Sequence, residues 1–329
     1  MKTAMPFTTK PHGKLLLTGE YFVLDGVPAL AVPTKLGQRL TVNLTRGVSL
    51  EWRANDHNGQ QWFRSSLASP QLGGTLDAQD TDDAFTARLR QIFRAAEVLR
   101  PGVFSAVSFG RMVTTDLEFD REWGLGSSST LIAAIAEWLE VDPYALLEAT
   151  FGGSGYDLAC AVADGPIVYR RNGGTPTVTP LDWRPAWAVT SCFVYRNQKQ
   201  NSREGIRAYR KAGASDVSKT RIGEITKALQ NQALHPRAAA QLLREHEQIV
   251  SATVGLPTVQ EELFPTFPGQ LKSLGAWGGD FIWAVSEESP EKVRAFFNER
   301  GYQTVIGYED MVLSSPGPSK GGELTKPFV

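Results

Sequence analysis

The sequence has 329 residues and a formal net charge of −1, with 42% hydrophobic and 21% charged residues. This composition indicates a globular chain, and its length favours two domains over a single core. A nearly neutral chain has no global basic field that would attract nucleic acid or an anionic membrane. No apolar run approaches the roughly 18 residues of a membrane-spanning helix, and residues 1–14 lack the apolar core of a signal peptide. We therefore expect a cytoplasmic protein with neither nucleic acid nor membrane partners.

The sequence contains only two cysteines, Cys160 and Cys192, and each lies within an apolar run. A disulfide framework or a zinc site would need more cysteines than these. We expect both to be buried free thiols, as suits a reducing compartment.

The first half of the chain carries strand and helix patterns in alternation. Apolar runs broken by turns or by polar residues predict strands in three regions, residues 14–44, 48–67 and 103–115. Asp25 and Gly26 form a hairpin signal, and a second turn is expected at residues 55–59. Helical spacing of apolar residues predicts a helix over residues 84–99. Asp142 followed by Pro143 is typical of the start of a further short helix.

The second half mixes strands and helices in a similar way. Strands are expected at residues 186–195, 280–286 and 302–308, and helices at residues 237–254 and 290–300. This mixture favours the α+β class, with helices packed on an antiparallel sheet. Residues 182–185 separate two strand-like segments, so we place the boundary between domains 1–184 and 185–329 there.

A glycine–serine loop precedes a helical pattern in residues 122–139 (EWGLGSSSTLIAAIAEWL). A helix N-terminus has N–H groups without partners and a partial positive charge, and small residues let an anion approach it. The predicted phosphate-binding loop consists of Gly124, Leu125, Gly126, Ser127, Ser128, Ser129 and Thr130. A capped helix after a flexible turn would give the same pattern. The chain has neither a G-x-x-x-x-G-K-[ST] motif nor the protein-kinase motifs.

Three stretches resemble, in order, the three signature motifs of the GHMP kinases, which phosphorylate small metabolites such as galactose, homoserine, mevalonate and phosphomevalonate. Residues 11–26 (PHGKLLLTGEYFVLDG) resemble the first motif, the loop at residues 124–130 resembles the ATP loop, and residues 273–281 (SLGAWGGDF) resemble the third. The resemblance covers most of the chain. It implies an N-terminal ATP-binding domain like domain 2 of ribosomal protein S5, a ferredoxin-like C-terminal domain, and ATP in the cleft between them.

Within this superfamily, the mevalonate-pathway branch is the most similar. Tyr21 follows Gly19 and Glu20 as in phosphomevalonate kinases, whereas mevalonate kinases usually have histidine at that position. Residues 152–171 (GGSGYDLACAVADGPIVYRR) resemble the GSGFDVAAAVYG-type segment of phosphomevalonate kinases. The resemblance therefore implies transfer of the γ-phosphoryl group of ATP to a mevalonate-pathway acceptor, with phosphomevalonate favoured.

Phosphoryl transfer needs a positioned acceptor oxygen, neutralised triphosphate charge and, for an alcohol, a destination for a proton. Asp157 enters an apolar segment, where a carboxylate needs a partner or a function. The resemblance makes Asp157 the candidate base or acceptor-orienting group, and a helix N-cap is its structural alternative. The resemblance also makes Lys14 a partner of Asp157 and of the transferring phosphoryl group, and such pairing would keep Asp157 ionised. A solvated lysine at a strand end is the alternative for Lys14.

The resemblance also implies Mg²⁺ bound with ATP, which typically takes one or two protein oxygens and keeps several waters. Ser128 is the expected metal-side serine and Glu148 the candidate second ligand, unless Glu148 is a solvated helix residue. The expected substrate-binding residues are Glu20, Tyr21, Ser154, Gly155, Lys199, Ser202, Gly278 and Gly279. A phosphorylated substrate would need cations such as Lys199, because a phosphate in a cleft must be paired. A structural ion pair for Glu20 and a solvated basic turn around Lys199 are the alternatives.

Several functions stay open beside a phosphomevalonate kinase. Mevalonate is the second candidate acceptor, and a sugar or homoserine kinase is a further one. A mevalonate diphosphate decarboxylase shares the fold, and it would release carbon dioxide. A catalytically silent nucleotide-binding relative would keep the fold without turnover. In each case the expected partner is a small molecule, and the chain is expected to be a monomer or a homodimer.

Overall fold

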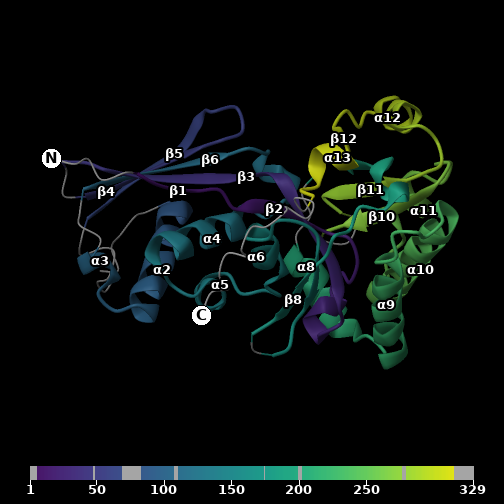
Figure 1. Cartoon of the computed structure of the whole chain (residues 1–329), viewed down its shortest axis with the longest axis horizontal. Helices are drawn as coiled ribbons and strands as arrows, with labels where there is room; N and C mark the ends of the chain where they lie inside the picture. The colour runs from purple at the N-terminus through teal and green to yellow at the C-terminus, as the bar shows by residue number, and fades with distance from the viewer. Residues whose placement is uncertain are drawn as a thin grey trace, which may run out of the picture.

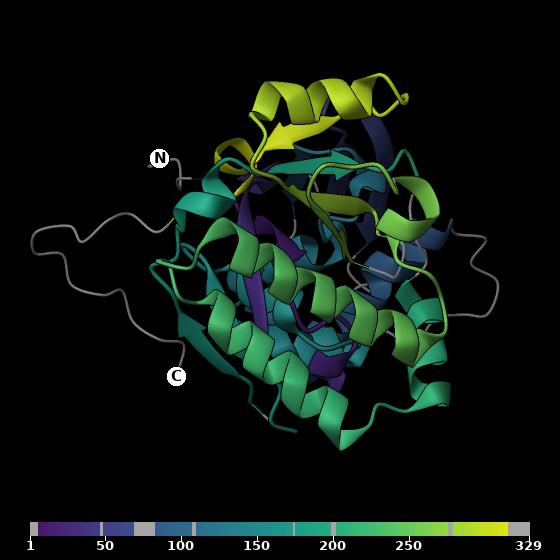
Figure 2. The same cartoon turned by 90° about the vertical axis from the view of Figure 1, so that its right-hand side faces the viewer.

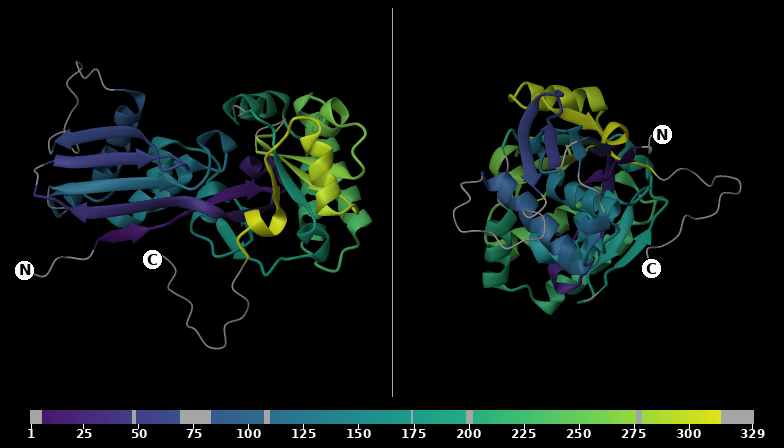
Figure 3. Two further views of the ribbon diagram at one scale, coloured as in Figure 1. Left: turned by 90° about the horizontal axis from the view of Figure 1, so that it is seen from above. Right: turned by 90° about the vertical axis from the view of Figure 1, so that its left-hand side faces the viewer.

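The elements of the computed structural model lie in two groups along its long axis, each built around one β-sheet (Figure 1). The structure describes residues 6–46, 49–68, 83–106, 110–173, 175–198, 202–275 and 279–314. Figure 3 shows the two groups from above, with the long strands of the first beside the shorter strands of the second.

The first sheet has eight strands. They are β1 (Phe7–Thr9), β2 (His12–Leu16), β3 (Ala29–Leu44), β4 (Ser49–Asn55), β5 (Gln61–Ala68), β6 (Arg111–Leu117), β7 (Ile167–Arg170) and β8 (Thr177–Pro180). The order is β5-β4-β6-β3-β7-β8, and β1 and β2 also pair with β3. The sheet is mixed, because β4 and β6 run parallel while its other pairs are antiparallel. The long strand β3 joins it together by pairing with four other strands.

Helices cover one face of this sheet (Figure 1). The helical elements of the first group are η1 (Phe22–Asp25), α2 (Ala84–Leu99), α3 (Val103–Ala106), η2 (Arg121–Trp123), α4 (Ser127–Leu139), α5 (Pro143–Thr150) and α6 (Tyr156–Ala161). Buried side chains of β4, α2 and α4, among them Trp52, Phe93 and Ile132, belong to one hydrophobic cluster between sheet and helices. The apolar stripe of an amphipathic helix must be buried against another layer, and this face of the sheet supplies it.

The second sheet contains β9 (Cys192–Tyr195), β10 (Gln270–Leu274), β11 (Phe281–Val285) and β12 (Val305–Gly307). Its order is β10-β11-β9-β12, and every pair is antiparallel. The accompanying helices are α7 (Ala186–Val189), α8 (Ser202–Ala212), α9 (Asp216–Leu229), α10 (Pro236–Val254), α11 (Val259–Leu263), α12 (Pro290–Asn298) and α13 (Tyr308–Met311). The order of strands and helices along the chain follows the ferredoxin-like β-α-β-β-α-β pattern. In Figure 2, α9 and α10 lie side by side toward the viewer, and α10 packs against β10.

Several sequence predictions are confirmed by these elements. The helix expected at residues 84–99 is α2, and the hairpin expected at residues 48–67 is β4 and β5. Asp142 caps α5, since its side chain accepts a hydrogen bond from Ala145 N at 2.7 Å, and Pro143 is the first residue of that helix. The α+β class is confirmed.

Other predicted elements are wrong in part. Asp25 and Gly26 do not form a hairpin turn: they end η1, and Gly26 adopts a left-handed φ of 79°. The strand predicted at residues 103–115 is the short helix α3 followed by β6. Likewise, the strands predicted at residues 186–195 and 302–308 are each part strand and part short helix. A short apolar run fits either structure, so periodicity alone could not separate them.

The helices α8 and α9 were not predicted. The strands of the first sheet end at Pro180 and those of the second begin at Cys192. The division into domains 1–184 and 185–329 stays a prediction.

Both cysteines are free and buried, as predicted. Among the described residues, no helix is both long enough and apolar enough to cross a membrane.

Candidate active site

A cavity of about 660 Å³ is lined by residues from both groups of elements. Its wall includes residues of β2, η1, the loop between η2 and α4, α5, α6, α8 and the connection between β10 and β11. This volume lies within the range of small-molecule sites. Most of the sequence-predicted site residues that the structure describes meet here.

The predicted phosphate-binding loop forms one side of the cavity. Gly124 and Gly126 both adopt left-handed φ values, 66° and 89°, and Gly126 is the N-cap of α4 with no side chain capping the helix. Ser127, Ser128 and Ser129 of the first turn line the cavity. An uncapped helix N-terminus bordered by glycine and serine can bind an anion through its backbone N–H groups.

Two of the predicted loop residues face the interior instead of the cavity. Leu125 is fully buried, and its carbonyl oxygen accepts a hydrogen bond from Lys14 N at 3.0 Å. Thr130 is buried as well, and its hydroxyl donates to Gln38 Oε1 at 2.7 Å. These two residues hold the loop against the first sheet rather than lining the cavity.

Lys14 lies on β2 and is only 8% exposed. Its Nζ donates to the carbonyl oxygen of Gly124 at 2.9 Å and lies 5.6 Å from the centre of the Tyr156 ring. The aliphatic part of the side chain passes close to Gly126, where an added Cβ would lie 3.2 Å from Lys14 Cγ. An ammonium group has three N–H donors, so Lys14 can bind the loop and still reach an anion in the cavity.

Asp157 lies in the first turn of α6 and lines the same cavity. The N-cap of α6 is Gly155, so Asp157 does not occupy the capping position that was its structural alternative. Within the part of the chain that the structure describes, its carboxylate makes no hydrogen bond or ion pair, and the expected pair with Lys14 is not formed. Burial, and then the charge of Asp157, raise the pKa of Tyr156, which therefore remains a neutral phenol.

The third motif contributes Gly275 and Asp280 to the wall. A Cβ at Gly124 would lie 2.0 Å from Asp280 Oδ2, so only glycine leaves room for this carboxylate beside the loop. Asp280 was missed as a site residue, although it lies inside the quoted motif. Of the two glycines that were predicted, Gly279 does not line the cavity and Gly278 lies outside the described residues.

Glu20 and Tyr21 line the cavity on the side of η1. Tyr21 has a left-handed φ of 61°, and its ring stacks on Tyr209 of α8 with centroids 5.7 Å apart. A Cβ at Gly205 would lie 2.1 Å from the Tyr21 hydroxyl oxygen, so α8 packs directly on this residue. The position of α8 is therefore coupled to the segment that carries Glu20.

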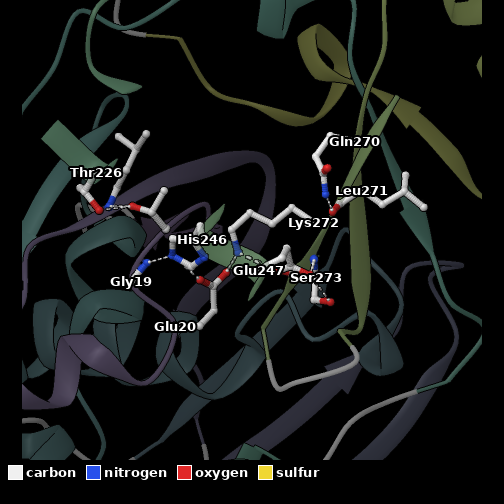
Figure 4. Close-up of polar contacts among 11 residues, drawn as sticks. Gly19, Glu20, Thr226, His246, Glu247, Gln270, Leu271, Lys272 and Ser273 are labelled. Carbon is white, nitrogen blue, oxygen red and sulfur yellow. Dashed lines mark hydrogen bonds and ion pairs between the residues drawn. The ribbon is translucent and has the colours of Figure 1, made fainter. Parts of the chain in front are cut away.

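Glu20 belongs to a buried group of polar side chains, which we call the glutamate–lysine cluster and which consists of Glu20, His246, Glu247, Lys272 and Ser273. Figure 4 shows Lys272 extending from β10 toward both glutamates. Its Nζ lies 2.5 Å from Glu20 Oε1 and 3.5 Å from Glu247 Oε1. Glu247 Oε2 accepts hydrogen bonds from Ser273 N and Oγ, each at 3.1 Å. The structural ion pair considered for Glu20 is therefore present.

Burial controls the protonation of this cluster. It raises the pKa of Glu247 to about 7, opposed by Lys272 and helped by Glu20, and it raises the pKa of Glu20 as well. Burial and Lys272 lower the pKa of His246, whose Nε2 accepts a hydrogen bond from Gly19 N at 2.9 Å. One ammonium group faces two carboxyl groups, so the cluster is neutral when one carboxyl carries a proton.

The remaining predicted site residues have varied positions. Ser128 and Glu148, the predicted Mg²⁺ ligands, are exposed and line the cavity. Ser154 also lines it, whereas Gly155 does not. Lys199 lies outside the described residues, and Ser202 begins α8, where only its backbone is described.

Sequence reasoning missed three arginines that line the cavity, Arg121, Arg171 and Arg210. Arg121 stacks over Trp62, with its guanidinium carbon 3.7 Å from the ring centre. Arg171 follows β7 and Arg210 lies near the end of α8. Arg171 ends a stretch that was singled out for its resemblance, but no motif marked its side chain.

Comparison with known proteins identifies the fold. No protein-family model and no curated protein matches the sequence. Solved structures do match, among them the Lin0012 protein from Listeria innocua, with 17% identity and a TM-score of 0.69 over 92% of this chain and 97% of that one. A mevalonate kinase from Methanococcus jannaschii has 13% identity and a TM-score of 0.66, covering 92% and 96%.

A phosphomevalonate kinase from Streptococcus pneumoniae, in complex with phosphomevalonate and AMPPNP, has 17% identity and a TM-score of 0.65 over 92% of this chain and 99% of that one. A galactokinase is also among the matches. Identities this low establish the fold and leave the acceptor open. The chain has the two-sheet α+β fold of the GHMP kinases.

Proposed function

We propose that the protein is an ATP-dependent small-molecule kinase that transfers the γ-phosphoryl group to a mevalonate-pathway acceptor. The proposal rests on one observation. Three features lie at the same cavity, namely the uncapped N-terminus of α4, Lys14 and Asp157. Each answers one need of phosphoryl transfer, namely anion binding, charge neutralisation and control of the acceptor oxygen.

The triphosphate of ATP would lie at the loop formed by Gly124, Gly126 and the three serines. Backbone N–H groups at the start of α4 and the ammonium group of Lys14 would stabilise its negative charge. Lys14 is held beside the loop by hydrogen bonds from both its backbone N and its Nζ. Such fixed charge needs little rearrangement when the transition state forms.

The cavity wall offers a donor set that suits Mg²⁺. Ser128 and Glu148 supply a hydroxyl and a carboxylate, which are hard oxygen ligands, and Mg²⁺ typically takes few protein ligands beside phosphate oxygens and water. When bound with ATP, the ion would neutralise phosphate charge. Ser128 and Glu148 would hold it on the loop side of the cavity.

Asp157 would orient the acceptor oxygen and receive its proton when the acceptor is an alcohol. Asp157 lines the cavity, and its carboxylate makes no hydrogen bond or ion pair to any residue that the structure describes. An acceptor that is already a phosphate gives up its last proton near pH 6, so it needs no base at neutral pH. Asp157 should therefore matter more for mevalonate than for phosphomevalonate.

Phosphomevalonate is the favoured acceptor, because Tyr21 and residues 152–171 resemble phosphomevalonate kinases. Mevalonate is the alternative. The experiment that tests this is ADP release by the purified protein with ATP and Mg²⁺, comparing the two acceptors. Turnover on mevalonate alone would keep the chemistry and change the acceptor. Failure with both acceptors, despite nucleotide binding, would favour the catalytically silent relative.

A further inference from the structure

Two arginines of the cavity wall have no role in the chemistry described so far. Arg171 and Arg210 line the cavity, and the guanidinium group of neither makes a hydrogen bond or an ion pair with any residue that the structure describes. Arg171 is half-buried, while Arg210 is exposed. Several other arginines contact glutamates, namely Arg184, Arg207, Arg221 and Arg237. Unpaired guanidinium groups at the wall of a cavity suit an anionic ligand.

Both arginines belong to the side of the cavity formed by η1. A Cβ at Gly26, which ends η1, would lie 3.0 Å from the carbonyl oxygen of Arg171. One residue before Arg210, Tyr209 donates a hydrogen bond from its hydroxyl to Asp25 Oδ2 at 2.9 Å. Arg171 and the residue before Arg210 thus lie against the same short segment.

This segment is separate from the phosphate-binding loop. Lys14 and Asp280 contact Gly124 of the loop, whereas Arg171 and Tyr209, the residue before Arg210, lie against η1. An anion bound by the two arginines would therefore be a part of the acceptor and not the triphosphate.

We infer that Arg171 and Arg210 form a subsite for an anionic group of the acceptor that is remote from the oxygen that receives the phosphoryl group. Carboxylate and phosphate are the two chemistries that such a pair of guanidinium groups binds. The inference rests on the proposed kinase function, and it makes the acceptor an anionic metabolite rather than a neutral sugar. Arg171 and Arg210 are then specificity-determining residues.

The experiment replaces each arginine by glutamine, singly and together, and measures ADP release. The acceptors are mevalonate and phosphomevalonate, which carry a carboxylate, a hexose phosphate, which carries a phosphate, and galactose, which carries neither. We expect each substitution to raise the KM of the anionic acceptor about tenfold to a hundredfold. The KM for ATP should stay within about twofold, and Arg→Lys should restore part of the loss. If wild type prefers mevalonate or phosphomevalonate and the variants raise that KM, the subsite binds a carboxylate. If wild type prefers the hexose phosphate and the variants raise that KM, the subsite binds a phosphate.

Two matched controls separate binding from structure. Arg207 lies on α8 three residues before Arg210, contacts Glu204 and does not line the cavity, so Arg207→Gln should leave both KM values unchanged. Arg170 donates from Nε to Gly26 O at 3.0 Å without lining the cavity. If Arg171 acted only by holding η1, Arg170→Gln would reproduce its effect, and the inference would be wrong.

Equilibrium binding measurements test the subsite independently of turnover. Titration calorimetry without ATP should detect mevalonate or phosphomevalonate binding to wild type and at least tenfold weaker binding to the double variant. That result with no ADP release would contradict the kinase function and support the subsite. An unchanged acceptor KM, a raised KM for ATP, a preference for galactose, or absence of binding by every anionic acceptor would each overturn the subsite.

Discussion

Lys14 and Lys272 are both nearly inaccessible, at 8% and 0% exposed, but their surroundings differ. Lys272 is enclosed by two carboxyl groups, so its charge is compensated within the protein. Lys14 has a carbonyl oxygen and an aromatic ring as neighbours, and no carboxylate is ion-paired with it in the described part of the chain. The cavity wall thus keeps charges that a ligand can neutralise, whereas the glutamate–lysine cluster keeps charges that neutralise each other.

The different surroundings of Lys14 and Lys272 indicate two functions of buried charge, ligand binding and pairing within the protein. A buried ion pair adds little net stability, yet removing one partner leaves an isolated charge that is costly. Charges that face a cavity without a partner favour an incoming ion of opposite sign. Substitutions of Lys14 or Asp157 should therefore change turnover more than stability, and substitution of Lys272 should do the reverse.

The largest effect is expected at the cavity. Asp157→Asn should reduce kcat on mevalonate about 100-fold to 10,000-fold, because the acceptor loses its base, and less on phosphomevalonate. Lys14→Ala should reduce kcat/KM about 100-fold to 1,000-fold through loss of charge stabilisation. Initial-rate kinetics measure both. Asp164→Asn, an exposed residue outside the cavity wall, is the control. Wild-type rates in both folded variants would refute the assignment of these residues.

The second effect is on stability. Lys272→Met leaves Glu20 and Glu247 buried without a cation, so we expect a loss of about 3–5 kcal/mol in the free energy of unfolding. Chemical denaturation measures it. Lys292→Met removes an exposed lysine that pairs with Glu288 and should leave the free energy of unfolding close to that of the wild type. Equal losses in the free energy of unfolding of Lys272→Met and Lys292→Met would contradict the contrast between buried and exposed ion pairs.

The third effect is a pH dependence of stability. Because the pKa of Glu247 is raised to about 7 from an unfolded value near 4.5, the folded state retains a proton that the unfolded state releases. The free energy of unfolding should therefore fall as pH rises from about 4.5 to about 7, by about 3 kcal/mol from this group. Glu247→Gln should flatten the curve, although Glu20, whose pKa is also raised, will keep part of the slope.

The neighbouring Glu245 provides the control for that measurement. Hydrogen bonding to Arg221 lowers its pKa, so its contribution to stability has the opposite sign and is lost only as pH falls through the acid range. Glu245→Gln should leave the slope between pH 5 and pH 7 as it is in the wild type. A wild-type slope in Glu247→Gln would show that Glu247 does not titrate in that range.

The smallest effect concerns the metal. Ser128→Ala and Glu148→Gln should each raise the Mg²⁺ concentration needed for half-maximal rate, by about tenfold, since each would remove one of few protein oxygens. Kinetics at varied Mg²⁺ and saturating ATP measure this. Glu140→Gln, an exposed residue that pairs with Arg100, is the control. Unchanged Mg²⁺ dependence would remove the residue concerned from the metal site.

The sequence predicted the features that depend on local pattern. The glycine–serine loop, the cap of Asp142 and the resemblance of three motifs indicated the fold and most of one cavity wall. Arg210 could not be predicted, because its place in the wall depends on α8 packing against Tyr21, a contact between segments nearly two hundred positions apart in the chain. Lys272 could not be predicted for a similar reason. Every residue of β10 is buried, so the strand has no alternation of buried and exposed residues that would indicate a lysine facing Glu20.

The most direct test of the account is ADP release by the purified protein with ATP and Mg²⁺, on mevalonate and on phosphomevalonate, in wild type and in Asp157→Asn. The account predicts turnover by the wild type on at least one acceptor, favouring phosphomevalonate, and a large loss in the variant on any alcohol acceptor. Wild-type protein that binds ATP yet releases no ADP with either acceptor, or a variant as active as wild type on mevalonate, would contradict it.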